Sequence, residues 1–152
     1  VMVGGFLTAL VLASGILGQT LGGIWGDRHP RHRIMVTVVT LNIPLLVLLT
    51  FTRSYPLVLV AVLWGVVNFA YQPISNALIS DVTSPRQRGT LFGILNGLNF
   101  GVGAFAATLA GAIGDRWGTA AIFIAMAVIL LPASVTGLLL RRNSTPISID
   151  SP

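Results

Sequence analysis

The chain has 152 residues, of which 54% are hydrophobic and only 9% charged, and its mean hydropathy is +0.87. An average soluble domain has about 25% charged residues, so this composition excludes an ordinary soluble globular domain. The net charge of +5 comes from arginines scattered between apolar runs, which argues against a nucleic-acid-binding surface. The sequence has no cysteine, which excludes disulfides, thiolate metal sites and cysteine nucleophiles.

Charged and turn-forming residues divide the chain into five long apolar stretches. Each stretch is long enough to cross a membrane core about 30 Å thick, which takes about 20 helical residues. The connectors are short, so consecutive helices are expected to be antiparallel neighbours. We therefore predict an all-α membrane protein whose helical bundle occupies residues 1–142. The predicted spans cover residues of about 3–25, 34–51, 57–79, 89–113 and 120–140.

The arginines predict the orientation of this bundle, because short cytoplasmic loops retain positive charge. Arg53 and Arg116 fall on one side of the membrane, and the other arginines fall on the opposite side. The first connector, the third connector and the C-terminal end are therefore expected in the cytoplasm, and Val1 outside. We expect a multi-pass protein of the cell membrane (inner or plasma membrane), with a disordered cytoplasmic tail at 143–152.

Small residues recur every four positions in two of the predicted spans. Such rows allow two helix backbones to approach closely, so we expect helix packing along them. The row in the first span consists of Gly18, Gly22 and Gly26, and the row in the fourth span of Gly93, Gly97 and Gly101. Three spans also contain a proline, which removes a backbone hydrogen bond and favours a kink. These prolines are Pro44, Pro73 and Pro132.

The first connector carries a motif of glycine, aspartate and arginine. Here the sequence resembles the major facilitator superfamily, whose members carry G-x-L-A-D-R-x-G-R-R between the second and third helices of each half. Gly23, Asp27, Arg28 and Arg31 match this pattern, and Gly26 is an acceptable small residue. Three positions depart from it: Trp25, Pro30 and His32.

A second resemblance to the same family lies at the third connector. Asp81, Pro85, Arg88 and Gly89 follow the pattern A-L-I-x-D, then P, then R-G, which connects helices four and five or ten and eleven of the family. The resemblance covers nearly the whole chain and implies part of a twelve-helix transporter. The short polar end after the last span favours helices eight to twelve of an efflux-type member, and helices two to six remain the alternative register.

Within that register the resemblance implies a substrate pathway along the first, third and fourth spans. Polar residues deep in a membrane usually face protein or water, although they also serve to link helices by hydrogen bonds. The candidate pathway residues are Gln19, Trp64, Asn68, Gln72, Ser75, Asn76, Asn96 and Asn99. No charged residue lies deep in any predicted span, so we expect no proton relay within this chain.

The function expected from this resemblance is secondary active transport of a small molecule by alternating access, of the drug or metabolite efflux type. Asp27 would then contribute to a cytoplasmic latch by facing a helix N-terminus of the opposite half. The expected partners are the lipid bilayer, the substrate and the other half of the transporter. No metal or cofactor is expected, and coupling to a proton or other ion gradient stays open.

Two other classes of function compete with transport. A non-transporting scaffold or degenerate remnant is the main alternative, because five spans cannot form a pathway between two halves. Upstream sequence encoding six or seven more spans would favour transport. An intramembrane enzyme is not expected, since both histidines lie in the first connector and no intramembrane acid could partner a serine.

Overall fold

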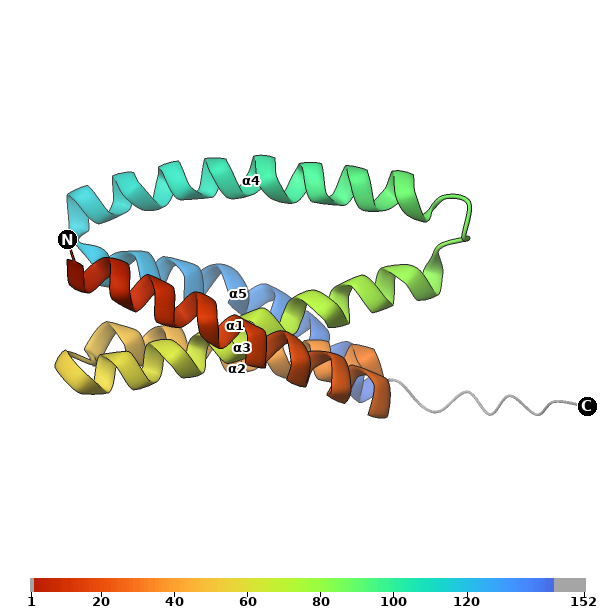
Figure 1. Ribbon diagram of the computed structural model, residues 1–152, viewed down its shortest axis with the longest axis horizontal. Helices are drawn as coiled ribbons and strands as arrows, with labels where there is room; N and C mark the ends of the chain where they lie inside the picture. Colours follow the sequence, from red (N-terminus) through yellow and green to blue (C-terminus); the bar gives the residue numbers. More distant parts are fainter. Residues whose placement is uncertain (1, 144–152) are drawn as a thin grey trace, which may run out of the picture.

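The computed structural model describes residues 2–143, and within this range all regular structure is α-helical (Figure 1). The helices are α1 (Met2–Arg28), α2 (Arg31–Phe51), α3 (Ser54–Val82), α4 (Arg88–Trp117) and α5 (Thr119–Asn143). Each of the five is long and apolar enough to cross a membrane. The predicted all-α membrane fold class is therefore confirmed. The predicted disordered tail lies, apart from Asn143, outside the described residues.

The helices extend a few residues beyond the predicted spans. Asp27 and Arg28 are still part of α1, and α2 already begins at Arg31. Long charged side chains at the end of a membrane helix can reach the headgroups without interrupting the backbone hydrogen bonds, so an apolar run underestimates its helix. The connection between α4 and α5 is the single residue Gly118, whose φ of 82° favours glycine and whose N–H bonds to the Gly114 carbonyl at 2.9 Å.

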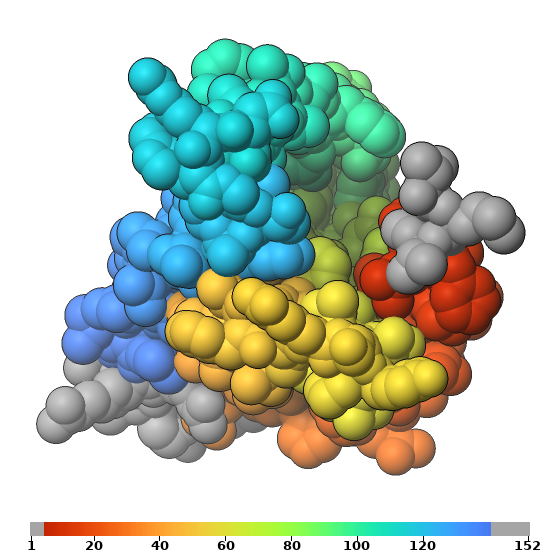
Figure 2. Space-filling view, turned by 90° about the vertical axis from the view of Figure 1, so that its left-hand side faces the viewer, coloured from red at the N-terminus to blue at the C-terminus, as the bar shows by residue number. Residues whose placement is uncertain are grey.

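Four helices form a row in the order α1, α3, α2, α5, with each packed on the next. Figure 2 looks along the helices from the end where α2 connects to α3, so that the row runs across the view with α1 at the right and α5 at the left. The α1–α2 and α3–α4 connections and the last turn of α5 all lie at the other end, on the right of Figure 1. We call it the arginine-rich end, because it carries Arg28, Arg31, Arg33, Arg86, Arg88, Arg141 and Arg142.

Glycines bring the backbones of α1 and α3 into direct contact. A Cβ atom built on Gly22 would lie 2.5 Å from the carbonyl oxygen and 2.8 Å from the Cα of Ala70. A Cβ on Gly18 would overlap the Val66 carbonyl in the same way. On the other side of this interface, Gly65 of α3 leaves room for Ser14 of α1. The close approach of these two helices therefore depends on residues without side chains.

The buried centre of the bundle lies where α2 meets α3 and α5. Val38, Ala70 and Ile74 form a buried apolar cluster between α2 and α3. The hydroxyls of Thr40 and Ser134 join α2 to α5 with a hydrogen bond of 2.8 Å. The helices continue without a break through all three membrane prolines: Pro44, Pro73 and Pro132.

Helix α4 stands apart from the row and packs mainly on α5 (Figure 1). None of its residues is buried within the described chain. Built Cβ atoms on Gly93, Gly97 and Gly101 meet nothing within 4 Å among the described residues. The packing role of this glycine row stays a prediction, and any partner for it lies outside the described helices.

Candidate functional site

The first loop motif forms the tight corner between α1 and α2. His29 and Pro30 are the only residues between these helices, and the His29 N–H bonds to the Trp25 carbonyl at 3.0 Å. The fixed φ of Pro30 suits the residue that directly precedes a helix, and its carbonyl accepts the Arg33 N–H at 2.9 Å. This corner brings the guanidinium of Arg31, at the start of α2, close to the carboxylate of Asp27, in the last turn of α1.

Arg31 connects the two loop motifs. Its Nη1 donates to both carboxylate oxygens of Asp81, at 2.6 and 2.7 Å, although the two residues are 50 positions apart in the sequence. Its Nη2 lies 3.4 Å from Oδ1 of Asp27. The Arg31 side chain is 31% exposed, whereas the Asp27 side chain is 75% exposed. Asp81 is therefore the principal partner of Arg31, and most of the Asp27 carboxylate remains accessible.

The second loop motif forms a turn that leads from α3 into α4. The Gln87 N–H bonds to the Ser84 carbonyl at 3.0 Å, which places Pro85 at the second position of a β-turn, where proline is favoured. The Arg88 guanidinium donates to the carbonyls of Ser80 at 3.1 Å and Thr83 at 3.4 Å. The carbonyls at a helix end lack intrahelical partners, so Arg88 caps the end of α3. A Cβ on Gly89 would meet nothing within 4 Å.

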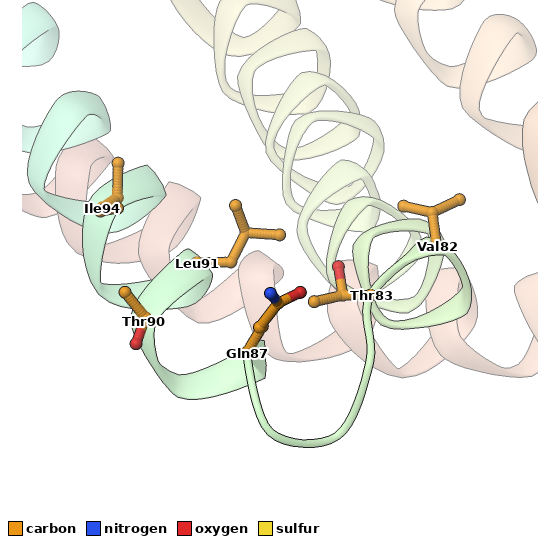
Figure 3. A pocket seen from close by; sticks show the side chains of 6 residues that line it. All are labelled: Val82, Thr83, Gln87, Thr90, Leu91 and Ile94. Carbon is orange, nitrogen blue, oxygen red and sulfur yellow. The ribbon is translucent and has the colours of Figure 1, made fainter.

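A cleft of about 440 Å³ lies beside this turn, between the end of α3 and the start of α4 (Figure 3). Val82 and Thr83 line it from α3, and Gln87, Thr90, Leu91 and Ile94 line it from the turn and α4. The lining therefore combines hydroxyl and amide groups with apolar side chains. No pattern in the sequence indicates this cleft, because its two walls belong to different helices.

The structure brings only some of the predicted pathway residues together. Trp64 and Asn68 line one cavity, which α2, α3, α4 and α5 enclose. Ser75 is half-buried on α3. Asn68 is itself exposed, and so are the remaining amide side chains: Gln19, Gln72, Asn76, Asn96 and Asn99.

Two features of the site were missed by sequence reasoning. The first is the pairing of Arg31 with Asp81, because their separation in the sequence gives no indication of contact. The second is Asn42, a buried amide of α2 that lines the same cavity as Trp64 and Asn68. Its signal in the sequence is a single amide in the middle of an apolar run, Leu41-Asn42-Ile43-Pro44.

The glycines of the first motif have different surroundings. Gly26 is buried, and a Cβ built on it would lie 3.5 Å from the Ile74 side chain, an ordinary contact distance. Gly23 meets nothing within 4 Å. Arg28, like Asp27, is exposed. The side of the motif formed by Gly23, Asp27 and Arg28 is thus accessible in the described chain.

Comparisons with known proteins find multidrug efflux pumps among the relatives of the chain. The chain is 30% identical over 142 residues to the multidrug efflux pump Tap of Mycolicibacterium fortuitum, covering 91% of this chain and 34% of that protein. It is 31% identical over 142 residues to Tap of Mycobacterium tuberculosis, covering 91% of this chain and 32% of that protein. The chain thus spans about a third of the length of the curated relatives it matches. No solved structure matches it.

The sequence pattern of the Major Facilitator Superfamily matches residues 1–151. The first loop motif forms the corner between α1 and α2, and the second forms the turn between α3 and α4. The spans around these motifs are five helices long enough to cross a membrane. The chain belongs to the major facilitator superfamily.

Proposed function

We propose that this chain forms most of one half of a secondary active transporter that exports drug-like small molecules from the cell by alternating access. The observation that carries the proposal is the Arg31 bridge between both loop motifs, in a chain whose relatives are named multidrug efflux pumps. The register proposed is helices eight to twelve of the twelve-helix fold, with the arginine-rich end in the cytoplasm and the protein in the cell membrane.

The bridge supports a half that moves as one body. Asp27 lies in the last turn of α1, Arg31 begins α2 and Asp81 lies in the last turn of α3, so two ion pairs hold three helices together at one end. Alternating access requires each half to rock as a unit about a site near the middle of the membrane. The accessible Asp27 carboxylate would then contact the opposite half, as the latch model expects.

The exposed polar groups of the bundle support the presence of an opposite half. Amides such as Gln72 and Asn96 are exposed within membrane-length helices, and polar groups facing lipid are costly. The glycine row of α4 also meets no other described helix. The exposed amides and the glycine row both fit a surface that another helical half covers or that lines a water-filled pathway. No charged residue lies within the apolar runs, so residues that couple transport to an ion gradient would belong to the other half.

The function is tested with the full-length protein in bacterial cells that lack their main efflux pumps. Cells loaded with ethidium or with a neutral dye should lose it faster than vector controls when they are energised, and an uncoupler should abolish the difference. If a broad panel of dyes and drugs shows no energised efflux while the protein is present in the membrane, the non-transporting alternative is favoured instead.

The orientation has its own test, because the chain has no native cysteine. Ser84→Cys places a thiol in the turn between α3 and α4, and Thr52→Cys places one in the connection between α2 and α3. In intact cells a membrane-impermeant maleimide should label Thr52→Cys and should label Ser84→Cys only after lysis. The reverse pattern contradicts the proposed orientation.

A further inference from the structure

A cavity lies halfway along the bundle, away from the arginine-rich end. It consists of two adjoining pockets of about 350 and 270 Å³, which share the side chains of Asn42, Asn68 and Leu130. Small-molecule sites usually have volumes of about 300–1,000 Å³. Asn68 is the middle residue of α3, and Asn42 is next to the middle residue of α2, so the cavity lies at the depth of the membrane centre.

Three polar groups around this cavity lack a full set of partners within residues 2–143. Asn42 is only 6% exposed and donates its Nδ2 to the Val38 carbonyl at 2.9 Å, which leaves its carbonyl oxygen without a donor in the described chain. The Asn68 amide makes no hydrogen bond to another described group. The indole Nε1 of Trp64 is buried and has no acceptor.

Of these three groups, the Trp64 N–H is buried without a partner, which is expensive at this depth. A buried donor or acceptor without a partner costs about 1–3 kcal/mol, and lipid tails cannot supply the missing bond. A hydrogen-bonding molecule inside the cavity would offset that cost. The amides of Asn42 and Asn68 line both pockets and can meet such a molecule directly, and Trp64 lines one of the two.

The remaining walls define the chemistry of the molecule. Apart from Tyr71, which carries a hydroxyl, they are apolar and include Leu46, Met126 and Ile129. No charged side chain lines either pocket. A cation or anion would therefore lose its hydration without gaining a counter-charge. A neutral, mostly apolar molecule with one group that both donates and accepts hydrogen bonds fits these walls best.

We propose that this cavity is a binding site for neutral aromatic or aliphatic molecules that carry one amide or hydroxyl group. Asn42 and Asn68 hold the polar group, and the α2, α3 and α5 side chains surround the apolar part. The site lies among the helices of this chain alone, so binding here does not require the proposed export activity. A lipid tail carries no hydrogen-bonding group at this depth, so its binding would not depend on the amides of Asn42 and Asn68.

The test uses the purified full-length protein in detergent and two probes of matched shape, 4-bromoacetanilide and 1-bromo-4-propylbenzene. Bromine quenches tryptophan fluorescence, and Trp64 lies at the cavity. The amide probe should quench saturably, and it should bind more tightly than the hydrocarbon probe. The cation 4-bromobenzyltrimethylammonium should not compete with it.

The variants Asn42→Leu and Asn68→Leu each remove one amide from the cavity. One hydrogen bond contributes about 0.5–1.5 kcal/mol, so each should weaken binding of the amide probe by about 2- to 12-fold and leave the hydrocarbon probe unaffected. Asn68 is exposed, so its replacement should not disturb packing even if Asn42→Leu folds poorly. Thr108→Val is the matched control, because this exposed α4 hydroxyl bonds to its own helix and lines neither pocket.

Three results would overturn the proposal. They are unsaturable quenching by the amide probe, equal affinity for the amide and hydrocarbon probes, and an equal affinity of the Asn68→Leu and Thr108→Val proteins for the amide probe. The second result would identify the cavity as a site for lipid tails. Because binding is measured without transport, none of these results depends on whether the protein exports dyes.

Discussion

Replacing Gly22 by alanine should separate α1 from α3. The added Cβ would lie 2.8 Å from the Cα of Ala70, whereas two carbon atoms rest at about 3.5–4.0 Å. The obstacle is backbone, so no side-chain rotation can relieve the clash, and the helices must move apart by about 1 Å. Overpacking of this kind typically costs about 1–3 kcal/mol. Alanine also favours the helix over glycine by about 1 kcal/mol, which partly conceals the loss.

Gly26→Ala is the control that isolates the clash. It makes the same chemical change one turn further along the same face, but its Cβ would lie at an ordinary 3.5 Å from the Ile74 side chain. Because both variants gain the same helix propensity, the difference between them should equal the clash, about 1–3 kcal/mol. The measurement is the free energy of unfolding of the full-length protein in mixed micelles. If Gly22→Ala is as stable as Gly26→Ala, the close packing of α1 on α3 is wrong.

Three further outcomes follow from contacts elsewhere in the bundle. Asp27→Asn should lower transport by the full-length protein without lowering its melting temperature, because Asp27 is mostly exposed and touches Arg31 only at 3.4 Å; unchanged transport kinetics would refute its latch role. Ser134→Ala removes the hydrogen bond from α5 to Thr40 of α2 and should lower the free energy of unfolding by about 0.5–1.5 kcal/mol. The Thr136 hydroxyl is exposed and bonds to its own helix, so Thr136→Val should change that free energy by less than about 0.5 kcal/mol. Equal effects of the two variants would contradict the interhelical bond. Gly137→Ala meets the Val36 side chain at 2.7 Å, so Val36→Ala should restore part of the lost stability, and strictly additive effects would show that the two residues do not touch.

The sequence predicted the helices well because their signal is local. A run of about 20 apolar residues is sufficient to indicate a membrane helix, and all five runs became helices. The boundaries were less accurate, since α1 continues through Asp27 and Arg28 with their charged side chains at the membrane surface. The glycine row of α1 was also visible, but the residues that it contacts, Val66 and Ala70, could be found only in the structure.

The contacts that define the site depend on which helices become neighbours. Arg31 and Asp81 lie in two different motifs, and only the packing of α2 on α3 brings them within 2.6 Å. Asn42 had a weak local signal, whereas the polar spacing along α3 drew attention to Asn68 and Trp64. The glycine row on α4 is the opposite case: its pattern in the sequence is clear, but the structure shows no contact for it among the described helices.

The most direct test of the account is the transport rate of Asp81→Asn compared with Asp115→Asn in the full-length protein. Both variants neutralise one aspartate, but Asp81 holds Arg31 at the arginine-rich end, whereas Asp115 lies at the opposite end and forms no ion pair within residues 2–143. With equal amounts of protein in the membrane, Asp81→Asn should slow energised dye efflux several-fold and Asp115→Asn should leave it near the unmodified rate. Equal rates for the two variants would contradict the claim that the Arg31 bridge between the loop motifs supports transport.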